Sequence, residues 1–148
     1  MVQDTSHAAS KSFLVTGAKG FIGSWIVKAL VERGDRPTIF DVDKASHRLE
    51  ALLTDEQLSA LRFIQGDVTH LADLERAVGE YGITHVLHLA GLQVPGCAAD
   101  PPRGAMINVV GTLNVFETAK KHRDQVKKIV YASSAAVFGP EEFYGGAR

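Results

Sequence analysis

Three glycines near the N-terminus have the spacing of a loop that holds phosphate groups. Gly17, Gly20 and Gly23 directly follow a short apolar run. In such a loop the first glycine permits a tight turn, the second lets the backbone approach a pyrophosphate, and the third lets a helix pack closely on a strand. The start of that helix offers free N–H groups and a partial positive charge to phosphates. Glycine also ends ordinary turns, so the glycines alone leave both interpretations open.

Two aspartates lie where a nucleotide would need hydrogen-bond acceptors. Asp41 comes 24 residues after Gly17, at the end of a predicted strand, where a carboxylate can accept from both ribose hydroxyls of adenosine. Neither Val42 nor Asp43 is an arginine that could hold a 2′-phosphate, which favours NAD over NADP. Asp67 is interpreted as an acceptor for the adenine amino group. The alternatives are a helix cap for Asp41 and an ordinary turn acid for Asp67.

The elements that must position these residues follow from the hydrophobic pattern. Short apolar runs alternate with stretches of helical period, which predicts strands separated by helices. Such alternation is typical of right-handed crossovers and a parallel sheet buried on both faces. The fold class is therefore α/β, a doubly wound Rossmann-type sheet of about five strands, where a full dinucleotide-binding fold has six. The predicted strands are residues 12–16, 38–40, 63–65, 84–89 and 129–132.

The rest of the chain is predicted to form one domain with short flanking segments. A Pro/Gly-rich loop is expected over residues 91–102 and a long amphipathic helix over residues 106–119. The length of 148 residues suits one domain. We expect a flexible arm at residues 1–10, an NAD-binding domain at 11–139, and a tail at 140–148 where a longer enzyme is cut short.

Composition and charge exclude several classes of protein. The formal net charge of -1 lacks the basic surplus typical of a nucleic-acid binder. No apolar run approaches the length of a membrane helix, and no secretory signal begins the chain. A single cysteine, Cys97, suits a reducing compartment, so a cytoplasmic location is expected. His85 and His88 point to opposite faces of a predicted strand, so no metal site is expected.

Six motifs together resemble the extended short-chain dehydrogenase/reductase family. They are TGAKGFIG, FDVD, GDVT, HLAG, NVVGTLNVFETAK and VYASSAAVFG, and their order and spacing match across residues 12–139. The pattern is most similar to the NAD-dependent epimerases and dehydratases of nucleotide sugars, the group typified by UDP-glucose 4-epimerase. The resemblance implies an oxidoreductase or isomerase that uses NAD as its cofactor and a sugar-like small molecule as its substrate.

The resemblance also implies roles for individual residues. Ser134 matches the catalytic serine or threonine that hydrogen-bonds the reacting hydroxyl, with an ordinary turn residue as the alternative. The remaining matches are cofactor-binding: Gly17, Gly20, Phe21 and Ile22 at the pyrophosphate, Asp41 at the adenosine ribose, Asp67 and Val68 at adenine, Leu89, Ala90 and Gly91 beyond the fourth strand, and Asn108 in the long helix.

The family's Tyr-x-x-x-Lys pair has no convincing match in this chain. Tyr144 and Arg148 have the spacing, but two intervening glycines disfavour a helix, and arginine replaces a catalytic lysine poorly. We therefore expect the NAD-binding portion of an epimerase/dehydratase-type oxidoreductase that is inactive as this chain. The alternative is a non-catalytic dinucleotide-binding or sensing module that acts through protein partners. The sequence leaves the oligomeric state open, with a homodimer among the options.

Overall fold

A computed structural model describes residues 11–139 of the chain. The predicted arm at 1–10 and the predicted tail at 140–148, with Tyr144 and Arg148, lie outside these described residues. The domain boundaries therefore stay a prediction. Within the described residues, no helix is both long enough and apolar enough to cross a membrane.

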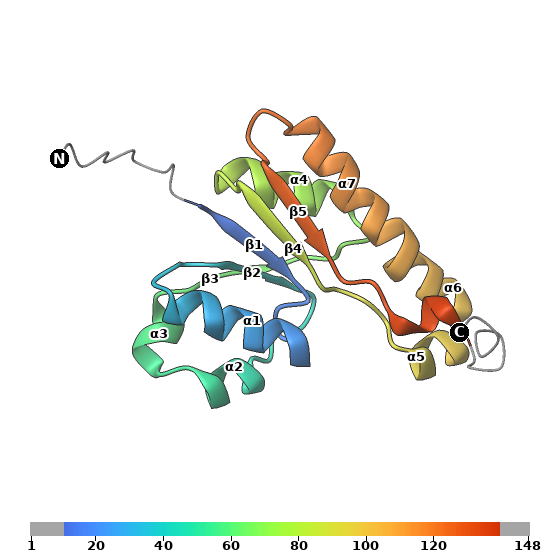
Figure 1. The fold of residues 1–148 in the computed structure, drawn as a ribbon, viewed down its shortest axis with the longest axis horizontal. Coiled ribbons are helices and arrows are strands. Elements are labelled where there is room, and N and C mark those ends of the chain that lie inside the picture. The colour runs from blue at the N-terminus through green and yellow to red at the C-terminus, as the bar shows by residue number, and fades with distance from the viewer. Residues whose placement is uncertain (1–10, 140–148) are drawn as a thin grey trace, which may run out of the picture.

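Five parallel strands form a single sheet in the order β3-β2-β1-β4-β5. From β1 the chain moves outward through β2 and β3, then returns to place β4 on the other side of β1 (Figure 1). The doubly wound α/β prediction is thus confirmed, and the reversal of strand order lies between β1 and β4. The strands are β1 Phe13–Thr16, β2 Thr38–Asp41, β3 Arg62–Gln65, β4 His85–His88 and β5 Lys128–Tyr131.

Helices cover the two faces of the sheet. On one face lie α1 (Phe21–Glu32), α2 (His47–Leu52) and α3 (Asp55–Ser59), and on the other lie α4 (Leu71–Glu80) and α7 (Gly111–Lys121) (Figure 1). Three further elements, α5 (Val94–Ala99), α6 (Pro101–Ala105) and η1 (Met106–Val110), join β4 to α7, and η2 (Ala135–Phe138) follows β5.

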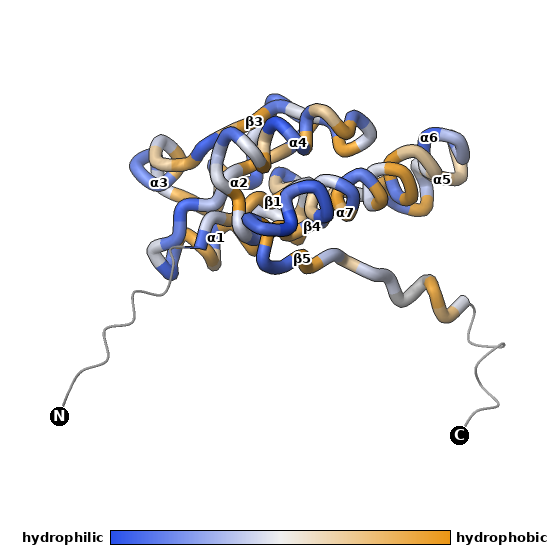
Figure 2. Tube along the Cα trace, turned by 90° about the horizontal axis from the view of Figure 1, so that it is seen from above, coloured by the Kyte–Doolittle hydropathy of each residue, from blue (hydrophilic) through white to orange (hydrophobic). Residues whose placement is uncertain are grey.

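The central strand β1 supplies side chains to both hydrophobic cores. Phe13 and Val15 pack toward α1, whereas Leu14 packs with α4 and α7, as the alternation of a strand requires. Along the helices the trace alternates between hydrophilic and hydrophobic residues (Figure 2). At the edge of the sheet, Val130 and Tyr131 of β5 remain exposed. The central strand β1 therefore lies between the two cores, and the Gly-rich loop follows it directly.

The segment predicted as a loop over 91–102 contains helices instead. It includes α5 and the beginning of α6, and α6, η1 and α7 then form one continuous helical run from Pro101 to Lys121. Asp100 begins this run because its side chain accepts a hydrogen bond from the Arg103 N–H, and two prolines occupy the first turn. The long helix thus begins five residues earlier than the hydrophobic pattern indicates. Its middle section, η1, is a π-helix, a form that often occurs near functional sites.

Candidate functional site

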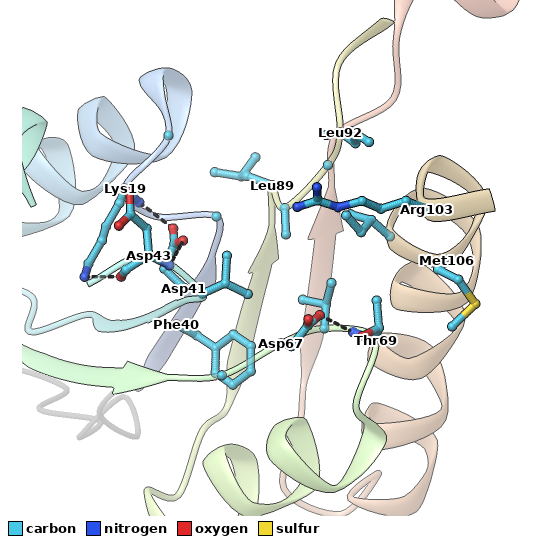
Figure 3. Close-up of a pocket in the computed structure, with 18 of the residues that line it drawn as sticks. Lys19, Phe40, Asp41, Asp43, Asp67, Thr69, Leu89, Leu92, Arg103 and Met106 are labelled. Carbon is cyan, nitrogen blue, oxygen red and sulfur yellow. Dashed lines mark hydrogen bonds between the residues drawn. The ribbon is translucent and has the colours of Figure 1, made fainter. Parts of the chain in front are cut away.

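A pocket of about 760 Å³ lies at the carboxyl ends of the strands, next to the reversal of strand order. Doubly wound sheets bind their ligands at this position. The walls come from the Gly-rich loop after β1, the segments that follow β2, β3 and β4, and one side of the helical run that begins at Pro101 (Figure 3).

The Gly-rich loop is shaped by close contacts that only glycine permits. Gly17 has φ of +64°, and a Cβ there would lie 2.6 Å from the Ala90 backbone nitrogen. A Cβ on Gly23 would overlap the Gly17 carbonyl oxygen and lie 2.7 Å from the Ala18 Cα. At Gly20 the only nearby atom is the Gly17 oxygen, at 3.1 Å, and this residue lines the pocket. The turn and helix-packing roles of Gly17 and Gly23 are visible in these contacts, while Gly20 leaves room for a ligand.

Asp41 is joined to the Gly-rich loop by hydrogen bonds. Its Oδ2 accepts from the Lys19 N–H at 2.9 Å, and its Oδ1 accepts from the Asp43 N–H at 3.1 Å. The Lys19 ammonium in turn donates to the carbonyls of Asp43 at 2.6 Å and Lys44 at 3.1 Å (Figure 3). Ser46, and not Asp41, occupies the N-cap position of the nearby helix α2. Asp41 also lines the pocket.

Asp67 and Val68 form the floor of the pocket after β3. The Asp67 carboxylate accepts from the Thr69 N–H at 2.8 Å, so this residue does act as a turn acid, and it also lines the pocket. Val68 is buried against the helical run, because a Cβ on Gly111 would lie 2.7 Å from its Cγ2. Gly111 thus lets the helix approach closely enough to form the opposite wall.

A buried histidine links the strands to the helical run. His88 is 3% exposed, and its Nδ1 lies 2.7 Å from the Thr16 Oγ1 while its Nε2 lies 3.1 Å from the Thr112 Oγ1. The Thr112 hydroxyl donates to the Asn108 carbonyl at 2.8 Å, so it accepts from His88. His88 is therefore a neutral Nε2–H imidazole that accepts from Thr16. Burial lowers its pKa, in agreement with this neutral form.

The same network positions the segment after β4. The Thr16 hydroxyl oxygen accepts from the N–H groups of Leu89 and Ala90, both at 3.3 Å. Asn108 holds the next part, because its Oδ1 accepts from the Leu92 N–H at 2.7 Å and its Nδ2 donates to the Leu92 carbonyl at 2.9 Å. Two separate anchors therefore fix residues 89–92 against the pocket. Asn108 itself contacts this segment and is not among the lining residues.

Most of the predicted site residues meet at this pocket. Those that line it are Gly17, Gly20, Asp41, Asp67, Val68, Leu89, Ala90 and Gly91. Phe21 and Ile22 begin α1, are 70% and 61% exposed, and are not among the lining residues. Ser134 is exposed in the segment between β5 and η2 and does not line the pocket. The roles of all these residues stay predictions.

Sequence reasoning missed several residues of the walls. Lys19 and Arg48 lie beside Asp41, and Arg103, Met106 and Ile107 project from the helical run. Arg103, Met106 and Ile107 have the i, i+3, i+4 spacing that places side chains on one face of a helix. This spacing is the sequence pattern that could have identified them. It was overlooked because Arg103 fell between the predicted loop, which ends at residue 102, and the predicted helix, which begins at residue 106.

The lining residues fit a dinucleotide better than a metal ion. The Gly-rich loop offers a close backbone approach, and Asp41 offers a carboxylate on the same pocket, the two features that a dinucleotide site needs. Among residues 11–139, no group of three or more His, Cys, Asp or Glu side chains could hold a metal. Cys97 donates its thiol hydrogen to the Leu92 carbonyl at 3.2 Å, which is a structural contact.

Several known proteins are similar to this chain in both sequence and architecture. The chain is 35% identical over 141 residues to a bifunctional UDP-glucose 4-epimerase and UDP-xylose 4-epimerase of Arabidopsis thaliana, covering 91% of this chain and 40% of that protein. It is 31% identical over 142 residues to human UDP-glucose 4-epimerase, covering 90% and 40%. The UDP-glucose 4-epimerase of Bifidobacterium longum, solved with NAD⁺ and UDP, superposes with a TM-score of 0.75 at 34% identity, covering 87% and 38%.

The chain spans about 40% of the length of these curated relatives. A family model described as the NAD dependent epimerase/dehydratase family matches residues 13–145, which is most of the chain. This match extends from the beginning of β1 beyond η2, so it includes the Gly-rich loop, Asp41 and the whole pocket. The chain belongs to the NAD-dependent epimerase/dehydratase family.

Proposed function

We propose that this chain is the NAD-binding portion of an epimerase/dehydratase-type oxidoreductase. The observation that carries the proposal is the pocket at the reversal of strand order, which joins the Gly-rich loop to the Asp41 carboxylate. In such a pocket the Gly20 region would hold the pyrophosphate and Asp41 the adenosine ribose. The network of His88 and Asn108 would keep residues 89–92 in place along the cofactor.

The substrate of the whole enzyme would be a nucleotide sugar or a related sugar-like molecule. The names of the similar epimerases support this class of substrate. Bound NAD supplies a hydride acceptor for the oxidation of a substrate hydroxyl. Ser134 follows β5 at the same edge of the sheet as Asp41 and Leu89, because parallel strands end together. From there it would hydrogen-bond the reacting hydroxyl and orient it.

We propose further that the 148-residue chain binds NAD without turning over a substrate. Within residues 11–139, neither Tyr81 nor Tyr131 is followed four residues later by a lysine. The described residues therefore lack the pair that would lower the pKa of a tyrosine and let it exchange a proton with the substrate.

The single cysteine supports a reducing, cytoplasmic setting.

Calorimetric titration of the chain with NAD tests the proposal. We expect saturable binding with one site per chain. An assay with UDP-glucose and NAD would show no epimerisation or reduction of NAD. Failure to bind NAD would refute the binding role, whereas turnover by this chain alone would refute the proposed lack of activity.

A further inference from the structure

Arg103 faces the pocket from a wall opposite the Gly-rich loop. It belongs to α6, and with Met106 and Ile107 it lines the pocket from one side of the helical run. Figure 3 shows its side chain extending from the helix toward the end of β4, where Leu89 lies. Lys19, Asp41 and Asp43 gather on the other side of Leu89 in the same view. Arg103 therefore lies away from the adenosine-ribose end of the pocket.

Local packing holds this part of the helix in one orientation. Gly104, the next residue, is buried, and a Cβ there would lie 3.0 Å from the Cys97 Sγ. Asp100 accepts a hydrogen bond from the Arg103 N–H at 3.0 Å and so fixes the first turn. With Gly104 turned toward α5, the Arg103 side chain is directed to the pocket instead.

The Arg103 guanidinium differs in its hydrogen bonding from Lys19 and Arg48, the other two cations that line the pocket. Lys19 donates to two backbone carbonyls, and an Arg48 Nη1 donates to the Lys19 carbonyl at 3.4 Å. For the Arg103 guanidinium, the structure records neither a hydrogen bond nor an ion pair with the described residues. The nearest acid in sequence, Asp100, directs its carboxylate to backbone N–H. The pocket thus contains a guanidinium with its donors available to a ligand.

The chemistry of the pocket indicates which ligand group would meet it. A guanidinium presents paired N–H donors that match the oxygens of a phosphate. In doubly wound folds the pyrophosphate of a dinucleotide crosses the sheet at the reversal of strand order. Here that point lies between the ends of β1 and β4, and Arg103 extends over the end of β4. A pyrophosphate there would have Gly20 on one side and Arg103 on the other.

We infer that Arg103 is a second contact for the pyrophosphate of the bound dinucleotide, opposite the Gly-rich loop. The inference rests on the proposed function, because it requires that the pocket bind NAD. It adds a charged side chain to a site whose other predicted pyrophosphate contacts are backbone groups. The contact would contribute affinity for the diphosphate and none for the nicotinamide or the adenine ring.

The test uses Arg103→Met, which keeps most of the side-chain stem and removes the charge. Titrations of the full chain with NAD and with ADP-ribose should show dissociation constants about tenfold higher than in the wild type, as for a lost charged hydrogen bond. Adenosine, which lacks phosphate, should bind both proteins equally. The affinity of the wild type for ADP-ribose should also fall more steeply with salt than that of the variant.

Arg123→Met is the matched control. Arg123 is exposed and lies just beyond the end of α7, at the opposite end of the helical run from α6. It should bind all three ligands like the wild type. Unchanged NAD binding in Arg103→Met would overturn the inference, and an equal loss of adenosine binding would instead assign Arg103 to the adenine ring. If Arg103→Met bound NAD normally and lost only the affinity of the NAD-saturated protein for UDP, Arg103 would instead be assigned to a second nucleotide site. If the wild type itself fails to bind NAD, the proposed function fails and not this inference alone.

Discussion

The Asp41 carboxylate at the end of β2 accepts a hydrogen bond from the backbone N–H of Lys19 in the Gly-rich loop, at 2.9 Å. This contact connects two segments that are 22 residues apart in the chain. It joins the loop proposed to hold the pyrophosphate to the residue proposed to hold the ribose. The two parts of the cofactor site are therefore built as one unit, and a change in either is expected to affect the other.

Gly20 and Gly23 should respond differently to alanine. A Cβ on Gly20 would meet only the Gly17 oxygen at 3.1 Å, whereas a Cβ on Gly23 would overlap that oxygen outright. We expect Gly20→Ala to fold nearly normally and bind NAD at least about tenfold more weakly, because its methyl group occupies the pocket. Gly23→Ala should lose about 1–3 kcal/mol of unfolding free energy or more.

Urea denaturation followed by calorimetric titration measures both effects. The two variants serve as controls for each other, since they carry the same substitution three residues apart in one loop. Wild-type affinity for NAD in Gly20→Ala would contradict the pyrophosphate assignment. Wild-type stability in Gly23→Ala would contradict the close packing of α1 on the loop.

Stability should depend on pH through His88. Burial lowers the pKa of this residue below 6.5 in the folded chain, so the unfolded chain binds a proton more readily. The unfolding free energy is then fully retained above about pH 6.5 and falls as the pH decreases below it, by at most about 1.4 kcal/mol per pH unit for one proton. His85 contributes in the same direction, since burial and then Lys11 and Lys128 lower its pKa.

His88→Gln isolates the contribution of His88, because glutamine can still donate and accept hydrogen bonds without titrating. Its unfolding free energy, measured in urea at pH 7.5 and pH 5.5, should change less between the two conditions than that of the wild type. An equal pH dependence in His88→Gln and the wild type would show that His88 does not titrate as described.

Asn108 should control the order of the segment after β4. Asn108→Ala removes both hydrogen bonds to Leu92, and this should cost about 1–2 kcal/mol and accelerate hydrogen exchange at the Leu92 amide. Asn114→Ala is a control on the same helical run, because its side chain donates to the Val68 carbonyl instead. Unchanged exchange at Leu92 in Asn108→Ala would mean that other contacts hold this segment.

Much of the framework could be predicted from local sequence. The apolar runs and the glycines each act over a few residues, so they predicted the strands, the Gly-rich loop and the position of Asp41 at the end of β2. The helical run from Pro101 was harder, because two prolines and a glycine hid its first turn from the hydrophobic pattern. Because that turn was not predicted as helix, Arg103 was not predicted to line the pocket. The partners of Asn108 and His88 depend on how distant segments pack, which no local pattern encodes.

The most direct test of the whole account compares NAD with NADP by calorimetric titration, in the wild type and in Asp41→Asn. The substitution removes the charge and keeps an oxygen that can accept from the Lys19 N–H. The account predicts that the wild type binds NAD at least about tenfold more tightly than NADP, because Asp41 accepts from the ribose and repels a 2′-phosphate, and that Asp41→Asn loses most of this preference. Equal binding of the two dinucleotides by the wild type, or an unchanged preference in Asp41→Asn, would contradict it.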